Sequence, residues 1–111
     1  MGVKKATILF LVMFVSSWTP SAFAYTQDTG TILELYTADN GAIAIKLSGG
    51  FPSAAVNNPC PGNNGYAGSS TANNALKAAL LTAKLLASNV RVTLTGCDGI
   101  WYKITDVYIL N

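Results

Sequence analysis

Two β-hairpin patterns, one in each half of the chain, constrain the fold more than any other feature of the sequence. In residues 31–48, two stretches rich in strand-forming residues flank Asn40-Gly41, a pair that tolerates the positive φ angles of a tight hairpin turn. In residues 90–110, apolar and polar residues alternate on both sides of Asp98-Gly99. The sequence therefore predicts two antiparallel strand pairs.

One helix is expected between the hairpins, over residues 71–88. Its apolar side chains recur at helical spacing and form one stripe, which consists of Leu76, Ala79, Leu80, Ala83, Leu86 and Ala87. Leu81 and Leu85 face nearly away from that stripe, where a surface helix of a monomer normally carries polar residues. Two interpretations stay open for these leucines: the preceding loop folds over them, or they form an interface between subunits.

The segment between the first hairpin and the helix, residues 49–70, is rich in Gly, Pro, Asn and Ser. We expect a long loop here, with one short strand near residues 65–68. The complete order is then strand, strand, short strand, helix, strand, strand, which describes a mainly β domain with one helix. This is the connectivity of a five-stranded OB-fold barrel. A helix packed on an open antiparallel sheet is an alternative, and a β-sandwich is a weaker one because the chain is short and interrupted by a helix.

The first 24 residues have the pattern of a secretory signal peptide. Lys4-Lys5 precedes an apolar run over residues 6–15, and Ala22-Phe23-Ala24 places small residues at the positions that a signal peptidase requires. The apolar run is too short to span a bilayer, which takes about 20 residues. We therefore expect cleavage after Ala24, a single secreted or periplasmic domain at residues 25–111, and no membrane span.

Cys60 and Cys97 are the two cysteines of the chain. An exported protein meets an oxidising compartment, so one disulfide is expected, and it would help to stabilise a domain of this small size. Two free buried thiols are the alternative. A metal site is disfavoured because the chain has no histidine and no Cys-x-x-Cys spacing, and no cofactor is expected.

Charge gives no indication of a nucleic-acid partner. The whole chain has a net charge of +2, and two of its lysines belong to the expected signal peptide. Residues 25–111 then carry five basic and five acidic side chains, and the basic ones do not cluster.

Catalytic groups are scarce, and we expect no enzyme. Histidine is absent, both cysteines are expected to be oxidised, and no phosphate-binding glycine motif is present. Glu34 and Asp106 could face each other as a glycosidase pair, but two solvent-facing strand positions explain them more simply.

Aromatic residues are the more informative group. Residues 25–111 contain seven of them, namely Tyr25, Tyr36, Phe51, Tyr66, Trp101, Tyr102 and Tyr108. Such side chains suit the apolar C–H faces of sugars, and they also suit ordinary core packing. Tyr66 lies in the Gly- and Asn-rich loop and is therefore the best candidate for an exposed contact.

Several segments together resemble the small exported proteins that are similar to the B subunit of subtilase cytotoxin. The segments that carry this resemblance are Thr29-Gly30-Thr31-Ile32, Asn58-Pro59-Cys60-Pro61, residues 75–87, Thr95-Gly96-Cys97 and residues 101–109. The resemblance implies an OB-fold of the AB5 toxin B-subunit type, which assembles into pentameric rings and binds cell-surface glycans. In that family, a serine at the start of the first strand helps to hold a sialic acid, and Thr29 matches it by position.

These considerations give two candidate sets of residues and three candidate functions. Thr29, Asp28 and Tyr66 are the candidate ligand-binding residues, and Leu81 and Leu85 the candidate oligomer interface. The first function is a glycan-binding, oligomeric, B-subunit-like protein. The second is a structural or protein-interaction module of the periplasm or cell surface, and the third is a small hydrolase.

Overall fold

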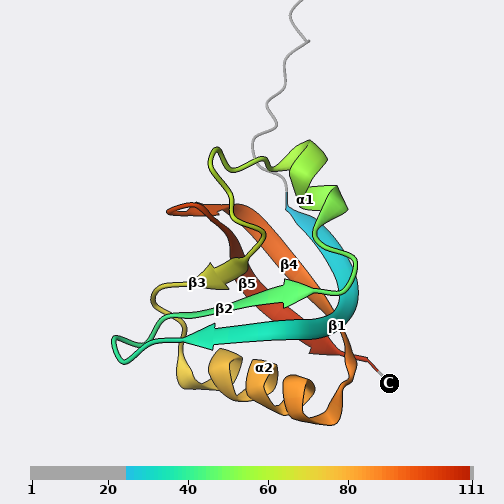
Figure 1. The fold of residues 1–111 in the computed structure, drawn as a ribbon, viewed down its shortest axis with the longest axis vertical. Coiled ribbons are helices and arrows are strands. Elements are labelled where there is room, and N and C mark those ends of the chain that lie inside the picture. Colours follow the sequence, from blue (N-terminus) through green and yellow to red (C-terminus); the bar gives the residue numbers. More distant parts are fainter. Residues whose placement is uncertain (1–24, 111) are drawn as a thin grey trace, which may run out of the picture.

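The computed structural model describes residues 25–110, and the expected signal peptide lies outside these described residues. Five strands and two helices make up the fold, and Figure 1 shows the strands arranged in a ring with a helix near either end. The elements are β1 (Thr26–Thr37), β2 (Ile43–Leu47), α1 (Pro52–Asn57), β3 (Ala67–Ser69), α2 (Asn74–Leu86), β4 (Asn89–Asp98) and β5 (Trp101–Ile109). The order around the ring is β1-β2-β3-β5-β4, and β4 pairs back onto β1. The expected mainly β architecture with five strands is confirmed.

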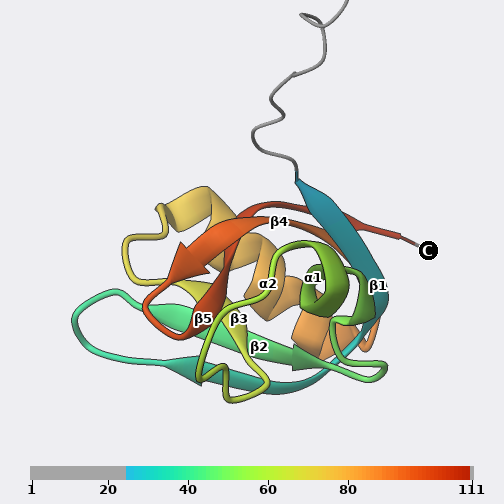
Figure 2. The same ribbon diagram turned by 90° about the horizontal axis from the view of Figure 1, so that it is seen from above.

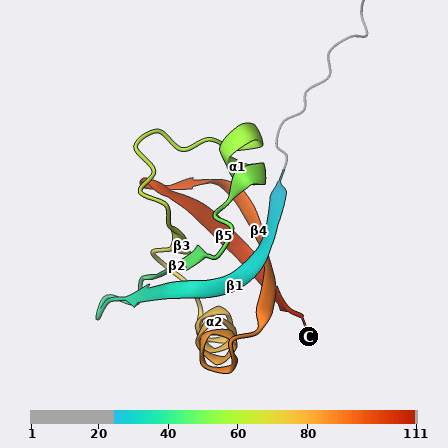
Figure 3. The ribbon, with the colours of Figure 1, turned by 45° about the vertical axis from the view of Figure 1, so that its right-hand side comes forward.

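Strand β1 is shared between two neighbours. Its first half pairs antiparallel with β4, from Thr26 to Thr31, and its second half pairs with β2 as far as Thr37. The register of the second pair shifts between Ile32 and Glu34, and such a bulge bends a strand and increases its twist. The strong curvature of β1 in Figure 3 follows from this, and it allows one strand to reach both sides of the ring.

Strand β3 closes the gap between β2 and β5 with only three residues. It is antiparallel to β2 and parallel to β5, which it meets at Ala67 and Gly68. Gly68 lies so close to β2 that a Cβ atom added there would collide with the carbonyl oxygen of Ile43 and lie 2.7 Å from the Cα of Ala44. Only glycine therefore allows β3 to approach β2 this closely.

The core lies inside the ring. Its largest fully buried side chains come from three strands, β2, β4 and β5, and from α2, and they are Ile43, Ile45, Leu80, Leu94, Ile104, Val90 and Val92. Helix α2 lies across one end of the ring (Figures 1 and 3). Asn73 caps the start of α2, where its side-chain oxygen accepts from the Leu76 backbone N–H at 2.9 Å.

The structure has a helix that was not expected. This helix, α1, lies within the segment that was expected to be loop, so the expectation of a single helix is wrong. Pro52 occupies the first turn of α1, and the carboxylate of Asp28 accepts from the backbone N–H groups of Ser53 at 2.9 Å and Ala54 at 3.1 Å. The acceptor that stabilises this helix start therefore comes from β1, and a six-residue helix is too short to show periodicity. Figure 2 shows α1 beside the first half of β1.

Several boundaries also differ from the expected ones. β1 begins at Thr26 rather than Thr31, because its first residues pair with a strand far along the chain. The first hairpin connection is wider than a two-residue turn. Gly41 has a φ of 96°, whereas Asn40 keeps a negative φ and its side chain accepts from the Ala42 N–H. The short strand lies at 67–69 rather than 65–68.

The expected disulfide between Cys60 and Cys97 is confirmed, with a Cα–Cα distance of 5.8 Å. It joins the segment between α1 and β3 to the end of β4. Within the described residues, no helix is long and apolar enough to cross a membrane.

Candidate functional site

Five side chains gather on the outside of the ring, over β1, β2 and the start of β5. We refer to Glu34, Tyr36, Lys46, Tyr66 and Trp101 as the aromatic face. Ile43, Ile45 and Leu47 of β2 point into the core, so the intervening Lys46 points outward. On β1, the bulge after Ile32 sets the alternation so that Leu35 packs on the core while Glu34 and Tyr36 point outward.

Tyr66 is in contact with both charged residues of the aromatic face. Its hydroxyl donates to a carboxylate oxygen of Glu34 at 2.7 Å. The ammonium nitrogen of Lys46 lies 5.0 Å from the centre of the Tyr66 ring, within the range of a cation–π interaction. Glu34 and Lys46 are direct partners in the β1–β2 register, so the tyrosine brings a carboxylate, a phenol and an ammonium group together on one surface.

The protonation of Tyr66 is set by its carboxylate partner. The hydrogen bond to Glu34 raises the pKa of Tyr66 above its ordinary value of 10.0, and desolvation and the Glu34 charge act in the same direction. The phenol therefore remains a hydrogen-bond donor to Glu34 across the neutral pH range.

The second part of the aromatic face is a ring pair. Tyr36 and Trp101 meet edge to face, with ring centres 5.9 Å apart and planes at 68°. Beside Tyr36, the register places the small residues Ala44 on β2 and Gly68 on β3, which pair with each other. Ala44 is fully buried although it lies on the outward side of β2, whereas Tyr36 is 46% exposed. The two rings therefore form a raised and partly open aromatic surface.

A network of hydrogen bonds holds the loop that presents Tyr66. The side-chain amide of Asn63 donates to the carbonyl oxygens of Tyr66 at 3.0 Å and Ile100 at 2.6 Å, and its oxygen accepts from the Gly65 N–H at 2.9 Å. The Tyr66 carbonyl also accepts from the Tyr102 N–H at 3.3 Å. The loop is thereby fixed to the turn that precedes Trp101.

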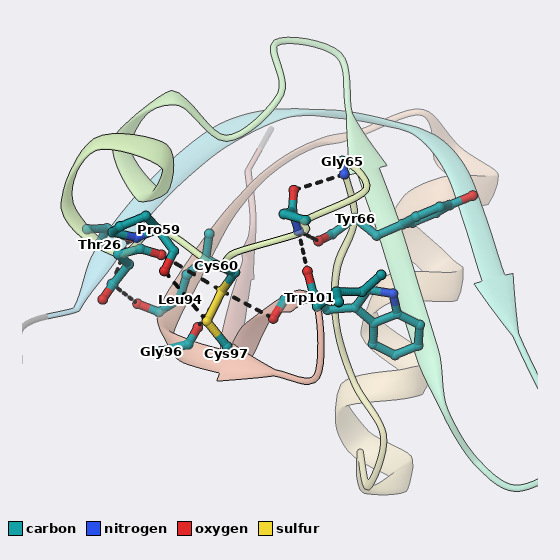
Figure 4. Close-up of a disulfide and its surroundings, with 12 residues drawn as sticks. Thr26, Pro59, Cys60, Gly65, Tyr66, Leu94, Gly96, Cys97 and Trp101 are labelled. Atoms are coloured by element: carbon teal, nitrogen blue, oxygen red, sulfur yellow. Dashed lines mark hydrogen bonds between the residues drawn. A yellow bond between two sulfur atoms is a disulfide. The ribbon is translucent and has the colours of Figure 1, made fainter.

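The disulfide anchors the same loop from its other end. The Cys60 sulfur lies 3.6 Å from the carbonyl oxygen of Trp101. A disulfide sulfur carries no proton, so this is a packing contact. In Figure 4, the rings of Tyr66 and Trp101 extend away from the disulfide on the same side. The covalent bond therefore anchors the segments from which both rings project.

The three predicted ligand-binding residues do not form one site. Tyr66 belongs to the aromatic face. Asp28 is buried, and both of its carboxylate oxygens are used at the start of α1. Thr29 is exposed, but it pairs with Arg91 of β4. It lies five positions before Glu34, or about 16 Å of strand.

The predicted interface residues are on the surface. Leu81 is 47% exposed and Leu85 is 83% exposed. The interpretation that the preceding loop folds over these two leucines is therefore wrong. They lie on α2 together with Leu86, which is 68% exposed.

Glu34 and Asp106 occupy different surroundings. Glu34 faces Tyr66, whereas Asp106 lines a groove of about 260 Å³ between α2 and β5, together with Leu76, Thr105 and Val107. No contact joins the two carboxylates among residues 25–110. In the same part of the chain, no group of three or more acidic, cysteine or histidine side chains is placed to hold a metal ion.

Sequence reasoning identified Tyr66 but not the residues around it. The alternation of β1 indicates that Glu34 and Tyr36 share a face, and Glu34 was expected to face solvent. The contact of Glu34 with Tyr66 spans 32 positions of the chain, and no local pattern predicts it. Comparison with protein-family profiles, with curated proteins and with solved structures finds no match to this chain.

Proposed function

We propose that this chain is a non-catalytic binding protein that recognises glycans through the aromatic face. The observation that carries the proposal is the partly exposed Tyr36–Trp101 ring pair beside the Glu34–Tyr66 hydrogen bond. A pyranose ring has an apolar C–H side, which packs on aromatic rings, and hydroxyl groups at its edge, which need hydrogen-bond partners. The aromatic face offers both within one surface.

Preorganisation supports the same function. Binding loses less free energy when the contacting side chains are already held in place. The bulge in β1 orients Glu34 and Tyr36, and the disulfide and Asn63 fix the loop and the turn that present Tyr66 and Trp101. Solvent-accessible polar and aromatic side chains that are held in this way favour a ligand-binding role over core packing alone.

We place the five-stranded ring with its α2 helix in the OB-fold class, and we interpret the chain as an exported protein similar to AB5 toxin B subunits. Five strands with a helix between the third and fourth support that placement. The exposed Leu81 and Leu85 support self-association through α2, because a monomer seldom exposes such residues in a group.

A glycan array tests the main proposal. The sample is residues 25–111, which contain the whole closed ring, refolded under conditions that form the disulfide. We expect binding to a restricted set of glycans and loss of that binding in Trp101→Ala. Tyr108→Ala is the matched control, because Tyr108 is an aromatic residue that is 49% exposed on the same strand, beside Arg91 rather than the aromatic face. Equal loss in both variants, or no glycan bound at all, would reject the proposal.

A second function, a protein-interaction module without sugar recognition, is favoured by the leucines of α2 alone. Light scattering separates the two. An oligomer that Leu81→Glu and Leu85→Glu dissociate without loss of folding assigns the leucines to self-association. A monomer that binds no glycan favours the interaction module.

A further inference from the structure

The charges of the aromatic face restrict what kind of ligand it can hold. Aromatic clusters with a carboxylate are suited to cationic ligands, which bind over ring faces. Here the face of the Tyr66 ring is already occupied by the ammonium group of Lys46, 5.0 Å from the ring centre. A cationic ligand would have to displace a cation that is covalently part of the chain and that is therefore always present.

Anionic ligands meet the opposite obstacle. Glu34 is exposed and holds its negative charge beside the Tyr66 hydroxyl. A second carboxylate within about 4–6 Å of it would be repelled, by the same interaction that perturbs neighbouring acidic groups. Lys46 does not attract the anion in compensation, because its positive charge is already paired with Glu34, its cross-strand partner.

We infer that the aromatic face takes an uncharged pyranose, and that Lys46 is the residue that sets this specificity. The C–H side of the sugar packs on Tyr36 and Trp101, and its hydroxyl groups donate to Glu34. Lys46 keeps the Tyr66 ring closed to ammonium groups and balances the charge of Glu34. This inference rests on the proposed glycan-binding function and adds the class of sugar to it.

The test compares three sugars that share one ring and differ in charge. The probes are a methyl pyranoside, its uronic acid and its 2-amino analogue, each in the glucose and the galactose series, so that the hydroxyl configuration does not decide the outcome. Trp101 is the sole tryptophan of residues 25–111, so its fluorescence reports ligand at this face directly. For the native protein we expect the neutral sugar to bind at least about tenfold more tightly than either charged analogue.

Two variants and one control variant test the assignment to charged residues. Lys46→Met keeps the length of the side chain and removes its charge, and it should raise affinity for the amino sugar by about tenfold. Lys84→Met makes the same chemical change on an exposed position of α2 and should change nothing. Glu34→Gln should weaken the neutral sugar by about tenfold and reduce the discrimination against the uronic acid. Circular dichroism of each variant shows whether the fold is kept.

The outcomes separate this inference from the function it rests on. If native protein binds the uronic acid or the amino sugar most tightly, the inference is overturned while glycan binding stands. If Lys46→Met leaves the preference among the three sugars unchanged, the role of Lys46 is overturned. If no sugar on the array or in solution changes the Trp101 signal, the proposed function fails, and the inference fails with it.

Discussion

Removal of the Cys60–Cys97 disulfide should cost about 4 kcal/mol of the free energy of unfolding. The two cysteines are separated by 37 positions, and the chain-entropy relation for a loop of that size gives an entropy of about −13 cal/mol/K, hence about 4 kcal/mol at 25 °C. An 87-residue domain has a total free energy of unfolding of roughly 4–13 kcal/mol. The loss is therefore a third or more of the total, and it should lower the melting temperature by about 20 °C.

Urea denaturation of a Cys60→Ala/Cys97→Ser double variant measures this loss. Cys60 is only 6% exposed, so alanine avoids burying an unpaired hydroxyl there, whereas Cys97 is exposed and tolerates serine. Each single variant, kept reduced, should lose nearly as much as the double variant, since either one removes the whole bond.

Two results would refute this reasoning. A loss below about 1 kcal/mol would mean that the loop is already constrained in the unfolded chain or that the bond is strained in the folded one. Single-variant losses that add up to the loss in the double variant would assign the effect to the packing of two side chains rather than to the cross-link.

Three further predictions follow from particular contacts. Asp28→Ala should destabilise the domain by about 2 kcal/mol in urea denaturation, because two N–H groups at the start of α1 lose their acceptor; a change below 0.5 kcal/mol, about the size of an ordinary surface substitution, would contradict this. Gly68→Ala should lower stability by about 2–3 kcal/mol, because the added methyl group collides with β2, whereas Gly49→Ala, with open space around it, should cost little by the same assay. The pKa of Tyr66, read by ultraviolet titration, should fall toward 10.0 in Glu34→Gln. In the native protein, the stability that this hydrogen bond contributes should be present below pH 10 and be lost as the pH rises through the raised pKa. An unchanged pKa in the variant would exclude Glu34 as the cause.

Local patterns were sufficient for much of the fold. The Asp98-Gly99 pair predicted the second hairpin turn, and Gly99 has the positive φ, 65°, that such a turn needs. Helical spacing of apolar residues predicted α2, and Leu80 and Ala83 of that stripe are buried. The disulfide could be predicted because the chain is short and has two cysteines after the expected signal peptide. The residues that determine the turn and the helix lie within those elements. The disulfide needs no local pattern, because two cysteines allow only one pairing.

Features that depend on distant partners could not be predicted in this way. Helix α1 is stabilised at its start by Asp28, 25 positions before Ser53. The aromatic face depends on the bulge at Leu33, which decides which residues of β1 point outward, and on the contact of Glu34 with Tyr66. A sequence pattern can indicate an exposed tyrosine, but the pairing of the strands determines which side chains contact it.

The sharing of β1 has a consequence for how the molecule is assembled during synthesis. Thr26 pairs with Leu94, and Thr31 with Asn89, so the first strand cannot complete its hydrogen bonding until residue 94 of the 111 has emerged. Such non-local pairing slows folding and leaves a strand edge open to other chains in the meantime. A ribosome-bound chain that stops before residue 89 should accordingly remain protease-sensitive, and the protected state should arise in one step once β4 is free to join.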